Sequence, residues 1–151
     1  MDKKKIIGGL AAVVIVIGGI YFWQVKIQRD SDPFAAYEAA MKEDGAGGAT
    51  PAETLAMFIA ALRAGDDRAA AQLFMLDDYG SRAAWDSRMA DLKARDVFGK
   101  MADDIEKNAK MTEPTYEGNA QFEVLNDNGT VGALIVMQLN TFSGVWKLQS
   151  L

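Results

Sequence analysis

The sequence predicts an α+β protein that begins with a transmembrane helix and continues into helices packed on an antiparallel sheet. Three observations carry this prediction. Residues 6–25 contain no charged side chain and directly follow three lysines. Between residues 50 and 110, apolar side chains recur with the 3.6-residue period of amphipathic helices. From residue 112 onwards the period changes to two, which is typical of strands, and helices followed by strands indicate the α+β class.

The N-terminal segment is predicted to be an uncleaved transmembrane signal anchor, within a first region of residues 1–25. At about 1.5 Å per residue, the run Ile6–Val25 spans roughly 30 Å, the thickness of a bilayer's hydrocarbon core. Tyr21 and Trp23 lie at the end of this run, where aromatic residues gather at membrane interfaces. A cleaved signal peptide is the main alternative, but its apolar region is shorter and ends in small residues, not bulky ones.

Positive charge predicts the orientation of this helix. Lys3, Lys4 and Lys5 should remain on the cytoplasmic side, which places the C-terminal domain outside the cytoplasm. Gly8 and Ala12 form a small-xxx-small pair that would let another membrane helix approach closely. We therefore expect a single-pass protein of the cell (inner) membrane, surrounded by membrane lipids, with a periplasmic or extracellular domain.

Composition limits the chemistry of the remaining chain, which is long enough for one compact domain. The sequence has no cysteine and no histidine, and its net charge is −5. A disulfide, a thiolate metal site, a cysteine nucleophile and the commonest general base are therefore excluded. An acidic domain does not favour contact with nucleic acid phosphates. We expect no cofactor, no metal and no nucleic acid partner.

Residues 26–49 are predicted to form a linker that carries one short helix. Pro33 suits the first position of this helix. Its apolar stripe consists of Phe34, Tyr37 and Met41. The run Asp44–Ala49 is rich in glycine and alanine, so we expect it to end the helix and act as a flexible hinge.

The predicted C-terminal domain, residues 50–151, opens with a well-marked helix. Thr50 can cap it, Pro51 takes its first position, and Glu53 completes a capping box. Gly65 is placed to end the helix. Its expected buried face consists of Leu55, Phe58, Ile59 and Leu62.

Three further helices are expected before the sheet. The first is short and begins at Asp66 or Asp67, and the second begins at Ser81. The third runs from about Val97 to Lys110. The second carries one apolar face, made of Trp85, Met89 and Leu92.

The end of the chain predicts four strands joined by tight turns. The first two cover residues 112–117 and 119–125. Residues 126–129, Asn-Asp-Asn-Gly, are a strong hairpin turn because Asn and Gly tolerate positive φ. The third strand, residues 131–140, is nearly all apolar, so we expect it to be central and covered on both faces. The last strand covers residues 145–151.

Two stretches of the domain are similar to those of a known family. One comprises Thr50-Pro51-Ala52-Glu53, Phe58, Leu62, Gly65-Asp66 and Ala69, and the other is Gly144-Val145-Trp146-Lys147-Leu148. Together they resemble the opening helices and closing strand of small NTF2-like (cystatin-like α+β) domains. The resemblance covers residues 50–151 and implies helices on one face of a curved antiparallel sheet of about four strands. The helical region from Ser81 to Lys110 is longer than the family's usual pattern.

Candidate site residues are few. The aromatic residues placed to line a cavity between helices and sheet are Trp85, Phe98, Tyr116 and Phe122, and packing in the core is the favoured alternative for them. The adjacent carboxylates are Asp77-Asp78 and Asp103-Asp104. Adjacent residues of a helix point about 100° apart, so these pairs are not expected to share a proton.

The NTF2-like family includes enzymes, ligand carriers and assembly modules, so the resemblance alone selects no function. From the anchor and the missing catalytic residue types we predict a non-enzymatic, membrane-anchored extracytoplasmic protein. Its expected role is that of an accessory or assembly subunit that binds other membrane proteins. The alternative is a small-molecule or lipid carrier that uses an NTF2-like cavity, and an isomerase-like enzyme is less favoured. A pilin is disfavoured because Lys5–Leu10 lacks the early glutamate of pilin helices.

Overall fold

A computed structural model describes residues 33–78, 80–112 and 117–151, and it divides the chain into two units, residues 1–37 and 38–151. The described part of the first unit is the beginning of helix α2, which runs from Pro33 to Glu43. Within the described ranges, no helix has the length and apolar character needed to cross a membrane. The predicted transmembrane helix Ile6–Val25 lies outside these ranges and stays a prediction.

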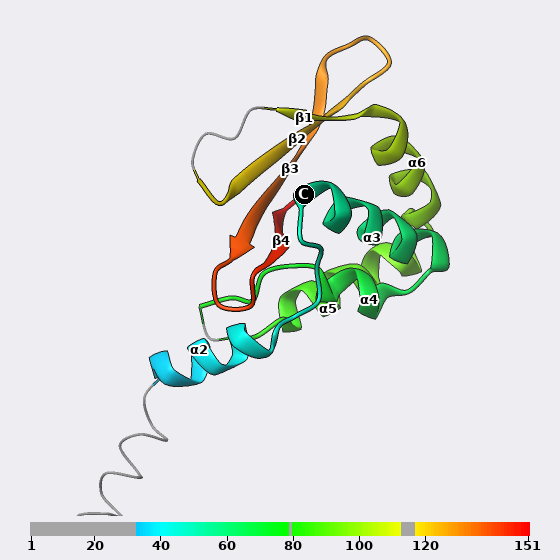
Figure 1. Cartoon of the computed structure of the whole chain (residues 1–151). Helices are drawn as coiled ribbons and strands as arrows, with labels where there is room; N and C mark the ends of the chain where they lie inside the picture. The colour runs from blue at the N-terminus through cyan, green and yellow to red at the C-terminus, as the bar shows by residue number, and fades with distance from the viewer. Residues whose placement is uncertain (1–32, 79, 113–116) are drawn as a thin grey trace, which may run out of the picture. The chain divides into compact units, whose positions relative to one another are not determined.

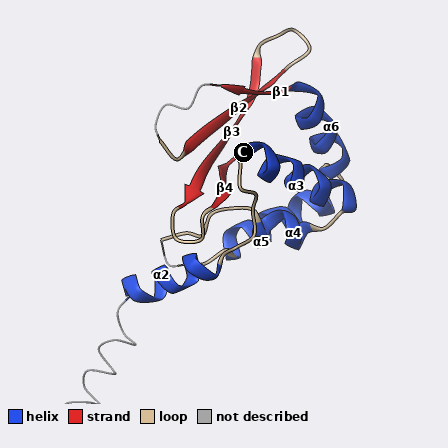
Figure 2. Ribbon diagram, viewed as in Figure 1, coloured by secondary structure: helices blue, strands red, loops and turns tan. Residues whose placement is uncertain are grey.

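The second unit confirms the α+β class, with helices packed on one face of an antiparallel sheet (Figures 1 and 2). Its further helices are α3 (Pro51–Ala64), α4 (Asp67–Gln72), α5 (Ala83–Ala94) and α6 (Phe98–Asn108). Its strands are β1 (Ala109–Thr112), β2 (Asn119–Leu125), β3 (Val131–Asn140) and β4 (Val145–Ser150). They follow one another in the sheet in the order β1-β2-β3-β4, which is a simple meander.

The core lies between the helices and one face of the sheet. Along β2, the buried residues Ala120, Phe122 and Val124 alternate with more exposed ones, as expected for a strand with one covered face. Phe122 lies opposite Ile135, and Ala120 lies opposite Met137, so β3 contributes to the same buried layer.

The start of α3 confirms the predicted cap. The hydroxyl of Thr50 accepts a hydrogen bond from the backbone N–H of Glu53 at 3.2 Å, and the carboxylate of Glu53 accepts one from Ala49 N–H at 2.8 Å. The helix ends before Gly65, which has a φ of 66°. The buried apolar residues of this helix are Leu55, Phe58, Ala61 and Leu62.

The predicted boundary between the last helix and the first strand is wrong. Helix α6 ends at Asn108, and the chain becomes extended at Ala109, with φ −74° and ψ 128°. Ala109 pairs with Val124, and Lys110 pairs with Glu123. Pairing with β2 therefore decides the conformation of residues that continue the local helical pattern, as tertiary contacts often override propensity.

Strand β3 is central, as predicted, but it is not covered on both faces. Its first four residues are exposed, and Val131 and Leu134 keep 49% and 42% of their accessible surface. Figure 1 shows the hairpin between β2 and β3 extending beyond the helices. The apolar run of this strand thus reflects its central position in the sheet more than burial.

The outer edge of β4 is occupied by two other segments of the chain. Trp146 N–H donates to Gly48 O at 2.9 Å, and Leu148 N–H donates to Leu73 O at 2.8 Å. Met75 N–H donates to Leu148 O at 2.8 Å. The segment before α3 and the segment after α4 are therefore both held against the last strand of the sheet.

Candidate functional site

Trp85, predicted as a cavity-lining residue, belongs to an aromatic cluster. Its ring stacks on Phe74 with centroids 3.8 Å apart and an interplanar angle of 20°. Phe74 in turn meets Phe58 edge to face at 5.7 Å. The guanidinium carbon of Arg88 lies 5.4 Å from the centroid of the Trp85 ring. These contacts give Trp85 a packing role between helices.

The other predicted cavity residues are distributed differently. Phe98 and Phe122 are each 5% exposed and belong to the hydrophobic core. Phe122 also borders a groove of about 320 Å³ between α3 and α6. The remaining predicted site residues, whose structure lies outside the described ranges, are Tyr116, Lys3, Lys4, Lys5, Gly8, Ala12, Tyr21 and Trp23.

A cavity of about 330 Å³ lies between α6 and the hairpin of β2 and β3. Its apolar lining includes Ile105 and Ile135, and its polar lining includes Lys100, Asp104 and Asp127. Lys100 Nζ donates to Asp104 at 2.5 Å, and this hydrogen bond raises the pKa of Lys100. The lining of the cavity thus mixes apolar and charged side chains, and none of the described aromatic candidates belongs to it.

The adjacent carboxylates serve separate contacts. Asp103 accepts a hydrogen bond from Arg63 at 3.2 Å, whereas Asp104 binds Lys100. The carboxylate of Asp77 accepts from the backbone N–H of Ser81 at 2.8 Å. Among the residues that the structure describes, no group of three or more acidic, histidine or cysteine side chains could hold a metal ion.

The most strongly built polar feature is centred on Lys147 of β4, whose side chain is fully buried. Its Nζ donates to Asp44 Oδ1 at 2.6 Å, to Ala46 O at 2.7 Å and to Gln72 O at 2.7 Å. An ammonium group has three protons, so these three bonds use all of them. Lys147 thereby joins the residues after α2 to the end of α4.

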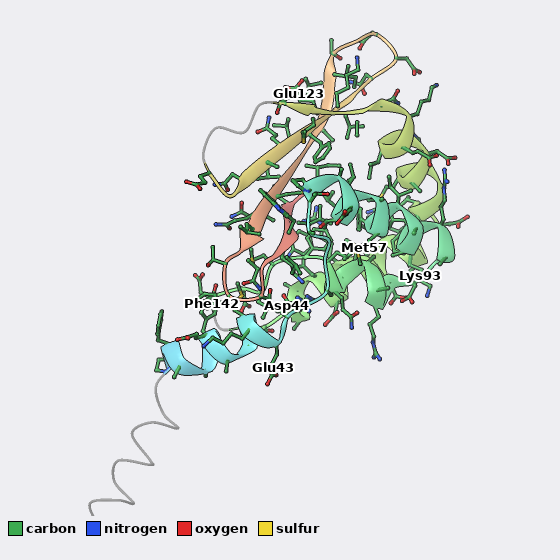
Figure 3. All side chains as sticks on the ribbon, in the orientation of Figure 1. Glu43, Asp44, Met57, Lys93, Glu123 and Phe142 are labelled. Carbon is green, nitrogen blue, oxygen red and sulfur yellow. The ribbon has the colours of Figure 1, made fainter. Side chains whose placement is uncertain are left out.

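Asp44 binds a second cation through its other oxygen. Arg82, which precedes α5, donates to Asp44 Oδ2 at 2.6 Å and to Phe74 O at 2.9 Å. The side chain of Asp44 is 5% exposed and that of Arg82 is 16% exposed, so solvent screens this pair little. Asp44 is labelled in Figure 3, close to the turn that carries Phe142.

The end of β3 and the turn after it carry two side chains that bind main-chain oxygens near the end of α2. Asn140 Nδ2 donates to Met41 O at 2.8 Å, and Ser143 Oγ donates to Asp44 O at 2.9 Å. The buried Thr54 hydroxyl donates to Trp146 O at 3.0 Å. The run Asp44–Ala49, expected to be a flexible hinge, is held by hydrogen bonds at several points.

Burial and the neighbouring carboxylate have opposing effects on the pKa of Lys147. Burial lowers the pKa of its amine to about 8, while the hydrogen bond and the charge of Asp44 act in the opposite direction. Nearby Arg82 also disfavours the charged amine. The carboxylate thus offsets only part of the cost of removing the ammonium from water.

This network is not predicted from the sequence. The sequence places Lys147 in the last strand and Asp44 in the expected hinge. The available signal is a single charge between Trp146 and Leu148, in a strand that has no other charged side chain. That signal does not reveal the partner, because Asp44 lies 103 residues earlier in the chain.

In comparisons with models of protein families, with curated proteins and with solved structures, nothing matches the chain. The structure by itself defines the class: an α+β domain with a four-stranded antiparallel meander, helices on one face and a buried ion network beside β4. The resemblance to NTF2-like domains stays a prediction.

Proposed function

We propose that the chain is a non-enzymatic accessory or assembly subunit of a membrane protein complex. In this proposal Ile6–Val25 anchors the chain in the cell membrane, with the lysines in the cytoplasm and the domain outside it. The domain, the anchor or both bind neighbouring membrane proteins.

The supporting observation is the use of the buried charges. Asp44, Arg82 and Lys147 attach the segment after α2 to the domain. An amine that acts as a base or nucleophile needs a free lone pair and access to substrate. Lys147 instead donates all its protons to fixed acceptors of the same chain. These buried charges therefore hold the segment after α2 in place, and the protons of the Lys147 amine are all used in that contact.

The test is purification of the full chain, with a C-terminal tag, from native membranes in a mild detergent. We expect defined membrane proteins to purify with it in constant ratio. A matched chain in which Ile6–Val25 is replaced by an unrelated apolar segment shows whether the anchor or the domain binds them. A chain that remains alone and monomeric in both forms contradicts the proposal.

The cavity beside α6 supports a second candidate, a carrier of a small apolar molecule or lipid. Its volume of about 330 Å³ and its partly apolar lining suit a small ligand. Native mass spectrometry of the full chain released from detergent tests this role. An added mass that disappears in Ala133→Trp, which places a bulky side chain at the cavity lining, supports it, whereas the mass of the bare chain alone argues against it.

A further inference from the structure

We infer that residues 41–48 form a rigid clamp that holds the part of α2 from residue 38 to residue 43 against the rest of the same unit. The clamp consists of these residues together with the side chains that bind them, Arg82, Asn140, Ser143 and Lys147. This inference goes beyond the proposed function and holds whether or not the chain belongs to a membrane complex.

Hydrogen bonds from several parts of the domain converge on residues 41–48. Three elements distant in sequence direct donors at the same segment: the end of β3 and the following turn, β4, and the residues before α5. They reach Met41 O, Asp44 O, Ala46 O and both carboxylate oxygens of Asp44. Backbone pairing of Gly48 O with Trp146 N–H closes the segment at its other end. A hinge would leave these groups to water.

The second argument is close packing at the glycines. A Cβ at Gly47 would lie 2.3 Å from Trp146 O, and one at Gly48 would lie 2.4 Å from the Cβ of Glu53. By contrast, a Cβ at Gly45 meets nothing within 4 Å. Two of the three glycines are thus required by the approach of the segment to β4 and α3, and they do not indicate flexibility.

The third argument concerns why charged groups hold this segment. A buried ion pair is expensive, and apolar side chains of similar size commonly give equal or greater stability. Directed bonds instead select one arrangement, because each oxygen of Asp44 has its own partner. The clamp is therefore suited to setting geometry.

The consequence is that the C-terminal end of α2 is held in place. Helix α2 ends at Glu43, the residue before Asp44, and Met41 in its last turn is both buried and bound by Asn140. The last turn of α2 is therefore held relative to β4. A domain attached in this way does not turn freely about residues 44–49.

The chain has no cysteine, so two introduced cysteines give unambiguous labelling. Ala39 on α2 and Ser87 on α5 are exposed and outside the clamp. Spin labels at Ala39→Cys and Ser87→Cys, in the full chain in lipid nanodiscs, report the distance between the two helices. We expect one narrow distance distribution. In Lys147→Met it should become at least twofold broader, and in Lys93→Met, which removes only an exposed pair with Asp67, it should not change.

A milder variant guards against loss of folding. Ser143→Ala removes only the bond to Asp44 O, and we expect intermediate broadening with an unchanged circular dichroism spectrum. A broad distribution in the unaltered chain overturns the inference. A narrow distribution that persists in both folded variants overturns it as well. Absence of co-purifying proteins would contradict the proposed function and leave these distances unaffected.

Discussion

At the scale of single residues, Lys147 determines how the domain is joined to the chain before it. It is the only fully buried lysine in the described residues, and its side chain points to the opposite side of the sheet from its two neighbours in β4. Leu148 faces the helices and enters the core, while Lys147 faces the other way, toward Asp44. One strand therefore contributes to both an apolar core and a charged clamp.

We expect Lys147→Met to lower the free energy of unfolding by about 3 kcal/mol, because removing one partner of a buried pair strands the other. Asp44 would keep only Arg82, and two carbonyl oxygens would lose their donor. Urea unfolding followed by tryptophan fluorescence measures the change. Lys100→Met, which removes an exposed pair, is the control and should leave the midpoint in place. Equal midpoints for the two variants would contradict this role.

The lowered pKa of Lys147 predicts that folding stability rises with pH in the basic range. Its value is about 8 in the folded chain and 10.5 when unperturbed. Below pH 8 the Lys147 amine is protonated in both the folded and the unfolded chain. Between pH 8 and pH 10.5 it is protonated only in the unfolded chain. Folding stability should therefore rise with pH in this window, by up to about 1.4 kcal/mol per pH unit.

The measurement is the difference in unfolding free energy between the unaltered chain and Lys147→Met at pH 7.5, 8.5 and 9.5. Other titrating groups cancel in this difference. We expect it to grow with pH, and a difference that is constant or shrinks would show that burial does not depress this pKa.

At the scale of elements, the glycines of the clamp provide the sharpest comparison. Gly47 has a φ of 153°, and an added Cβ would collide with Trp146 O. We expect Gly47→Ala to cost about 1–3 kcal/mol through backbone strain. Gly45→Ala, two residues away in open space, should be neutral or stabilising by about 0.4–1 kcal/mol. Thermal unfolding of the two variants measures both changes. Similar losses of stability at the two positions would indicate that the segment is not packed as described.

Elements governed by local signals were predictable from the sequence. The bounds of β2 and β3, the turn at residues 126–129 and the cap at Thr50 all follow from side-chain period and turn chemistry. In that turn Gly129 has a φ of 79°, and its N–H binds Asn126 O at 2.9 Å. Each of these features depends on residues a few positions apart.

Elements governed by distant contacts were not predictable. Residues 109–110 continue a helical pattern, but pairing with β2 makes them a strand. Residues 44–49 have the composition of a hinge, but donors from the turn after β3, from β4 and from the residue before α5 bind them. In both cases the deciding partner lies too far along the chain for periodicity or composition to identify it. The candidate site was missed for the same reason.

At the scale of the whole molecule, the chain combines an anchor that is predicted from the sequence with a domain that the structure describes. The anchor rests on the uncharged run and on the lysines before it. The clamp shows that the residues following α2 are built into the domain.

The most direct test of this account is the accessibility of single cysteines in intact cells that express the chain. Asp2→Cys lies before the lysines, and Ser87→Cys lies on the exposed surface of α5. With a maleimide that does not cross the cell membrane, we expect Ser87→Cys to be labelled in intact cells. Asp2→Cys should be labelled only after the cells are lysed. Both variant proteins should be found in the membrane fraction. Labelling of Asp2→Cys in intact cells, protection of Ser87→Cys, or recovery of the chain in the soluble fraction would contradict the account.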